Sequence, residues 1–103
     1  MRQSEKITMQ ISYTANAFGT LIQLVNYIES ENTKGAGLCW LNRYELFLQK
    51  ILIHPQQIKL CNNLTFNQLN LRCIYFNDWI IALSVSDDSV LIEALLHRSR
   101  LSD

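Results

Sequence analysis

The spacing of apolar residues changes along the chain, and each change marks a different kind of element. Residues 6–13 alternate apolar and polar side chains, which is the pattern of a half-buried strand. From residue 15 to residue 31 apolar side chains recur every three or four positions, as on one face of a helix. Thr14 stands where the N-cap of that helix belongs. The expected buried stripe of this first helix comprises Phe18, Leu21, Ile22, Val25 and Ile28.

A second helical pattern covers residues 36–53, and Pro55 ends it because the residue before a proline is pushed out of helical geometry. Three aromatic residues, Trp40, Tyr44 and Phe47, lie at helical spacing beside its apolar stripe. They either widen the core face, as most such residues do, or form a protein-docking surface, because interface anchors are enriched in aromatic residues. The expected buried stripe itself comprises Leu38, Leu41, Leu48, Ile51 and Leu52.

The last third of the chain reads as a meander of strands. Residues 71–76, 79–85 and 90–96 are rich in β-forming side chains, and short turns separate them. Such short connections imply antiparallel pairing, because parallel pairing needs a long crossover. Residues 56–68 carry a weaker pattern, in which Ile58, Leu60, Leu64 and Phe66 belong to a short strand or a packed loop.

The order of these elements predicts an α+β fold. An N-terminal strand precedes a helical hairpin, an antiparallel three-strand meander follows, and the helices pack on one face of the sheet. A chain of 103 residues is expected to form a single domain.

Composition limits the classes of protein to which the chain can belong. Apolar residues make up 49% of the sequence and charged residues 17%, which excludes a disordered chain. Nine basic residues balance nine acidic ones, which argues against broad, nonspecific binding of polyanions but leaves room for a local basic site. The low charge and the many apolar positions indicate that a partner covers part of the surface.

The cysteines and the N-terminus indicate the cellular compartment of the protein. Cys39, Cys61 and Cys73 form no C-x-x-C pair, and the N-terminus lacks the apolar core of a secretory signal. These features predict reduced core thiols in a cytoplasmic protein. No stretch approaches the ~20 apolar residues that span a bilayer, so we expect no membrane association.

The sequence lacks the motifs of most common catalytic sites. Nucleotide-binding loops, zinc-protease motifs and nucleophile elbows are absent from the sequence, and neither of the two histidines has a Cys or His at metal-ligand spacing. We therefore expect no cofactor and no metal. The remaining feature is a cationic set, which is either a solvated edge or an anion site for a phosphate or an acidic peptide. Its members are Arg72, His97, Arg98 and Arg100.

The pattern from Leu71 to the C-terminus resembles the ParE/RelE superfamily of type II toxins. Over this stretch, LRCIYFNDWIIALSVSDDSVLIEALLHRSR contains an arginine strand, a turn, an aromatic-started apolar strand, an acidic turn, an apolar strand, a leucine-histidine pair and a basic end. The strand–helix–helix order before it also fits, so the resemblance covers nearly the whole chain. It implies a toxin of a toxin–antitoxin module that arrests growth and forms a hetero-oligomer with its cognate antitoxin.

Two branches of the superfamily imply different targets. ParE-like members bind and inhibit DNA gyrase, whereas RelE-like members cut mRNA on the ribosome with basic side chains. Ile80 follows Trp79 where RelE-like sequences commonly carry an arginine, and the ending Leu96-His97 is more similar to the ParE branch. We therefore expect a ParE-like, non-catalytic inhibitor, with a RelE-like endoribonuclease and an inactive, antitoxin-binding relative as alternatives.

Each alternative assigns roles to specific residues. In the ParE-like interpretation, Trp40, Tyr44 and Phe47 anchor the antitoxin. His97, Arg98 and Arg100 then engage gyrase or the acidic antitoxin. In the endoribonuclease interpretation the reaction would be carried out by Arg72, His97, Arg98 and Arg100, because cleavage of RNA needs clustered cations and an acid–base group.

Overall fold

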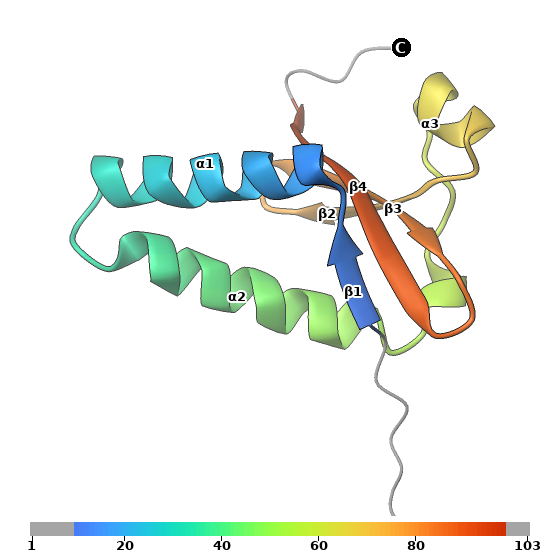
Figure 1. The fold of residues 1–103 in the computed structure, drawn as a ribbon, viewed down its shortest axis with the longest axis horizontal. Helices are drawn as coiled ribbons and strands as arrows, with labels where there is room; N and C mark the ends of the chain where they lie inside the picture. The colour runs from blue at the N-terminus through green and yellow to red at the C-terminus, as the bar shows by residue number, and fades with distance from the viewer. Residues whose placement is uncertain (1–9, 99–103) are drawn as a thin grey trace, which may run out of the picture.

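The predicted α+β architecture is confirmed by a computed structural model, which describes residues 10–98 (Figure 1). Two antiparallel helices, joined by a short turn, pack beside a sheet that contains the C-terminal meander. The elements in chain order are β1 (Gln10–Tyr13), α1 (Ala15–Glu31), α2 (Ala36–Ile51), a 3₁₀ turn (Pro55–Gln57), α3 (Leu64–Gln68), β2 (Arg72–Phe76), β3 (Trp79–Val85) and β4 (Ser89–His97).

The sheet has four strands in the order β1-β4-β3-β2. The meander pairs antiparallel as expected, with Phe76 opposite Trp79 across the first turn. The predicted N-terminal strand takes an edge position and runs parallel to β4, with Tyr13 opposite Ile92. A parallel connection of this kind needs a long crossover, which the helical hairpin and the meander supply. Residues 6–9 of the predicted strand lie outside the described residues.

Helix α1 begins and ends at the residues that the sequence predicts, and Thr14 caps it by accepting a hydrogen bond from the backbone N–H of Ala17. Its buried face differs from the expected one, because Ala17, Leu21 and Leu24 are buried whereas Phe18 and Ile22 are about half exposed. The small side chain of Ala17 allows α1 to approach the sheet along this line. The sequence pattern alone did not separate the two neighbouring faces.

Helix α2 shows a similar correction. Trp40 and Tyr44 of the aromatic stripe lie in the core, together with Leu48 and Leu52 of the expected apolar stripe. Leu38, which was expected in the core, is 64% exposed. The helix stops at Ile51, before the predicted end at residue 53.

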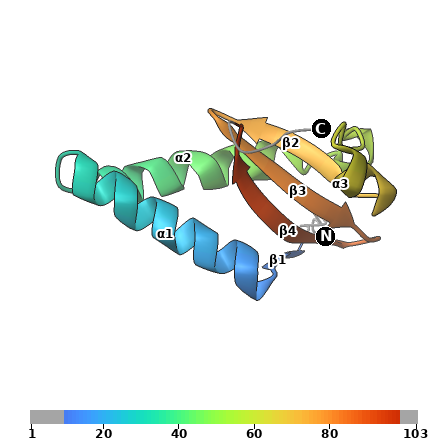
Figure 2. The ribbon, with the colours of Figure 1, turned by 90° about the horizontal axis from the view of Figure 1, so that it is seen from above.

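The sheet is covered on both faces, and β3 is buried from both sides (Figure 2). Ile81 and Leu83 belong to the core under the helical hairpin. Ile80 and Ala82 belong to a second, smaller cluster on the opposite face. The residues between α2 and β2 cover that second face. Leu64 and Phe66 lie in α3, whereas Leu60 forms only an isolated β-bridge and Ile58 is buried in a loop.

The three cysteines correct the prediction of reduced core thiols. Cys61 and Cys73 are bonded in a disulfide with a Cα–Cα distance of 4.8 Å, and Cys39 is exposed and free. The sequence concealed this pairing, because it arises when Leu60 forms an isolated β-bridge with Arg72 and places the two cysteines side by side.

Candidate functional site

Arg72 starts β2, and its guanidinium is occupied by the backbone. The Nη1 group donates a hydrogen bond to the carbonyl oxygen of Ile58 and a second, at 3.4 Å, to that of Gln56. These contacts fix the 3₁₀ turn against the sheet. They also direct the guanidinium towards carbonyl oxygens, which leaves this arginine in a structural role.

The other members of the predicted cationic set lie at the end of β4. His97 is opposite Trp79, and their rings meet edge to face with centroids 5.4 Å apart. The Arg98 side chain is exposed, while its backbone N–H donates to the carbonyl of Asp78 at 2.8 Å. Arg100 lies outside the described residues.

The register of the sheet separates Arg72 from His97. Arg72 is opposite Leu83 and His97 is opposite Trp79, so their levels on β3 are four residue steps apart. At about 3.3 Å per residue this is about 13 Å along the strands, and two strand spacings add about 10 Å across them. The two Cα atoms are therefore about 16 Å apart, and the Arg72 guanidinium is held by the carbonyl oxygens of Ile58 and Gln56.

The three predicted aromatic anchors mostly form the core. Trp40 is 6% exposed and Tyr44 is 1% exposed, and their rings stack with centroids 5.3 Å apart. Phe76 of β2 packs against both, and its centroid is 5.0 Å from that of the half-buried Phe47. The interpretation that these residues widen the core therefore holds for Trp40 and Tyr44, which offer almost no surface to a partner.

A pair of tyrosine hydroxyls ties β1 to α2. The Oη atoms of Tyr13 and Tyr44 are 3.0 Å apart, and one hydroxyl donates to the other. Burial raises the pKa of both tyrosines above the ordinary value, and the negative charge of Glu45 acts in the same direction. Both hydroxyls therefore stay protonated near neutral pH, and the pair serves as a structural link.

An exposed apolar surface lies beside this link, and two of its residues on α1 were expected in the buried stripe of that helix. Phe18 is 49% exposed and Ile22 is 45% exposed, one helical turn apart on α1. The ring of Phe18 meets that of Tyr13 with centroids 5.9 Å apart. Ile11, two residues earlier on β1, shares the face of Tyr13 and is 37% exposed.

Helix α2 extends this surface. Gly37 lies directly against the carbonyl oxygen of Val25, so the following turn of α2, with Leu41, runs past the Ile22 side of α1. Leu38 lies on the same side of α2 as Leu41. We call the whole surface the apolar strip. Its exposed members are Ile11, Phe18, Ile22 and Leu38, and its partly buried members are Tyr13, Val25 and Leu41.

The part of the chain that the structure describes meets neither the requirements of a metal site nor those of a membrane-spanning helix. Within residues 10–98, no three His, Cys, Asp or Glu side chains are grouped so as to hold a metal ion. Over the same residues, no helix has the length and apolar character that crossing a membrane requires.

Neither the models of known protein families nor the curated proteins give a match for this chain.

Proposed function

We propose that this protein is the toxin of a type II toxin–antitoxin module, a ParE-like inhibitor that binds DNA gyrase in the cytoplasm and is neutralised by a cognate antitoxin. The proposal rests on the resemblance of the sequence to the ParE/RelE superfamily. It is supported by the fold, whose strand, helical hairpin and meander follow the order that this resemblance implies.

One observation favours binding over catalysis. An endoribonuclease needs its cations and its acid–base group around one phosphate, but the register holds Arg72 and His97 about 16 Å apart. The guanidinium of Arg72 also bonds to the carbonyl oxygens of Ile58 and Gln56. The RelE-like alternative therefore lacks a converging set of side chains within residues 10–98.

The apolar strip is the surface that we assign to the antitoxin. It replaces Trp40 and Tyr44, which are buried. An amphipathic helix or extended segment binds such a surface with apolar side chains at regular spacing. The strip includes Ile11 and Tyr13 of β1, and β1 ends the sheet among the described strands and offers backbone groups on its outer side.

The direct test measures both possible activities on the same purified protein. Supercoiling by gyrase is assayed beside in vitro translation, with primer extension on the message. Inhibited supercoiling with intact message would support the proposal, whereas cut message with normal supercoiling would replace it with the endoribonuclease. If neither activity is present but the antitoxin still binds, the protein is an inactive relative.

The antitoxin surface has a matched pair of variants. Phe18 and Tyr27 are both exposed aromatic residues of α1, but they are nine positions apart and so point to opposite sides of the helix. Co-expression with the product of the adjacent gene tests each. Phe18→Glu should weaken the complex at least about tenfold, as loss of an aromatic anchor does, and Tyr27→Glu should leave it unchanged. Equal binding by both variants would exclude the apolar strip as the antitoxin surface.

A further inference from the structure

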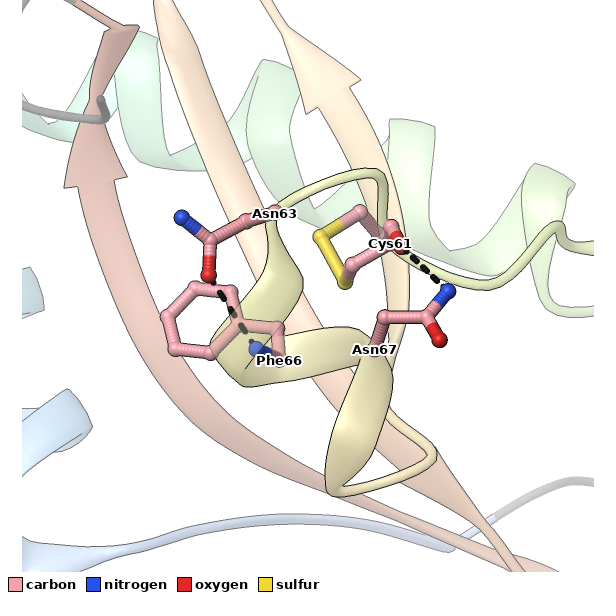
Figure 3. The surroundings of a disulfide bond; sticks show 5 residues. Cys61, Asn63, Phe66 and Asn67 are labelled. Carbon is pink, nitrogen blue, oxygen red and sulfur yellow. Dashed lines mark hydrogen bonds between the residues drawn. A yellow bond between two sulfur atoms is a disulfide. The ribbon is translucent and has the colours of Figure 1, made fainter. Parts of the chain in front are cut away.

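The segment between α2 and β2 covers the sheet face that the helical hairpin leaves open, and a disulfide fastens it there. Cys73 belongs to β2, and Cys61 lies 12 residues earlier, in the covering segment. Figure 3 shows the disulfide and the α3 turn on one side of the strands, with a long helix on the other side. The disulfide therefore joins the covering segment to the sheet itself.

The hydrogen bonds of this segment gather around the same point. The N–H of Cys61 donates to the carbonyl of Leu71 at 2.9 Å, and the N–H of Cys73 donates to that of Lys59 at 3.2 Å. The side-chain amide of Asn67 donates to the carbonyl of Cys61 at 2.8 Å (Figure 3). Opening the segment near Cys61 would therefore break these contacts together.

Apolar packing under the segment is small. The buried cluster on this face contains the two cysteines, Leu71, Ile80 and Ala82, with Phe66 and Ala94 partly buried against it. Leu64 and Leu69, at the two ends of α3, are 63% and 62% exposed. Because two of the five buried members are the bonded cysteines, much of the attachment depends on the disulfide.

We propose that the Cys61–Cys73 disulfide is a redox-controlled clasp: a dithiol reductant opens it, and residues 59–70 then detach from the sheet while the core under the helical hairpin stays folded. Detachment uncovers Ile80 and Ala82 of β3. The apolar surface that this protein presents on its second face thus depends on the redox state of its surroundings. The clasp does not depend on the proposed function.

Reduction proceeds by two thiol–disulfide exchanges. A thiolate of the dithiol attacks one sulfur, the Cys61–Cys73 bond breaks, and a mixed disulfide forms. The second thiol of the dithiol, as its thiolate, displaces the remaining cysteine, so the reductant leaves as its own disulfide. Two electrons pass from the dithiol to the cystine, and the two protons that the dithiol loses are balanced by those that Cys61 and Cys73 gain.

Burial sets the route of this exchange. Cys61 is 1% exposed and Cys73 is 8% exposed, so an attacking thiolate reaches the sulfurs only after the segment opens locally. The rate of reduction should therefore level off as the dithiol concentration rises. After reduction the open form should be more populated by about a hundredfold, which is the effect of removing a cross-link that closes a loop of this length.

The test is hydrogen–deuterium exchange with mass spectrometry on the whole chain, oxidised and reduced with dithiothreitol. Cys39→Ser serves as the background in both states, because Cys39 is exposed and free and would form mixed disulfides. Amide exchange in residues 59–70 should rise about a hundredfold on reduction and return on reoxidation. Exchange in the buried part of α2, residues 40–48, should not change. Cys61→Ser with Cys73→Ser should reproduce the reduced pattern.

Three results would overturn the clasp. Equal protection of residues 59–70 in both redox states would mean that the disulfide does not hold the segment. Loss of protection in α2 together with the segment would mean that reduction unfolds the whole domain. Alkylation of Cys61 and Cys73 by iodoacetamide in the unreduced protein would mean that the bond does not form.

Discussion

Replacing Gly37 by alanine tests how closely the two helices approach each other. Gly37 lies in the first turn of α2, and a Cβ atom there would stand 2.7 Å from the carbonyl oxygen of Val25. It would also stand 3.2 Å from Oε1 of Glu29, the oxygen that accepts a 2.8 Å hydrogen bond from the N–H of Gly37. The added methyl group therefore meets the backbone of α1 and displaces a carboxylate that fixes the turn.

The expected magnitude follows from two opposing effects. Overpacking against a rigid neighbour costs about 1–3 kcal/mol, and a helical carbonyl cannot move aside as a flexible side chain can. Alanine in place of glycine returns about 1 kcal/mol through helix propensity, and less in a first turn. Gly37→Ala should therefore lower the free energy of unfolding by about 2 kcal/mol.

Gly19 provides the matched control. It lies within α1, and an added Cβ atom meets nothing within 4 Å. Gly19→Ala should therefore stabilise the protein by about 0.5–1 kcal/mol. Urea denaturation followed by circular dichroism measures both variants, and thermal midpoints should move in opposite directions by about 4–8 °C per kcal/mol. Equal or greater stability of Gly37→Ala relative to the wild type would refute the close approach of the helices at this turn.

Two further predictions concern ionisable groups that hold elements together. The N–H groups of Gly35 and Gly37 lower the pKa of Glu29, so its contribution is complete above the ordinary pKa of about 4.5 and is lost as the pH falls through the lowered value. Urea denaturation should show that Glu29→Gln weakens the protein at pH 6 and that this difference shrinks at pH 3; an undiminished difference would contradict the assignment. Tyr44→Phe should cost about 1 kcal/mol, because Tyr13 loses its partner. Since burial raises the pKa of both tyrosines, their contribution should fall as the pH rises above 10, and absorbance at 295 nm should show their late ionisation. Ionisation of all four tyrosines at the ordinary pKa would contradict the burial of this pair.

Much of the fold could be predicted from the sequence because the spacing of apolar residues and the capping and turn residues indicate the same element boundaries. The α1 boundaries follow from Thr14 as N-cap and from the helical spacing that starts after it. The β2–β3 turn follows from Asn77, which adopts a positive φ of 54° that asparagine tolerates well. Each of these signals acts within a few residues, so no tertiary information is needed to interpret it.

The orientation of each helix could not be predicted, because two adjacent faces of each are apolar. Phe18 and Ile22 of α1 continue the apolar spacing of Leu21, and only contact with the sheet shows that they lie on the outer side. The same ambiguity placed Leu38 in the core and left the position of Tyr44 open. A helix with more apolar residues than its buried face can hold therefore indicates an exposed apolar surface. In this protein the additional apolar residues form the apolar strip.

The candidate site was hardest to predict because strand pairing sets the relative positions of its residues. Arg72 and His97 are both cationic candidates in sequence, but the register of β3 sets their separation. Cys61 and Cys73 meet only because Leu60 bridges to Arg72. Neither the separation of the cations nor the pairing of the cysteines has a local signal in the sequence. The short α3, between Cys61 and Cys73 in the chain, is held by tertiary contacts and by its N-cap Asn63, whose side chain accepts a hydrogen bond from the N–H of Phe66 at 3.1 Å.

The two surfaces proposed here lie on different sides of the sheet, and this arrangement separates their functions. The apolar strip is built on the helical hairpin and β1, whereas the clasp covers the face that carries Ile80 and Ala82. Between them β3 contributes Ile81 and Leu83 to the larger core, where both are fully buried. Opening the clasp removes packing from the smaller cluster only, so the strip keeps its support. A partner bound on the strip and a redox signal read at the clasp can therefore act on the same chain without competing for the same side chains.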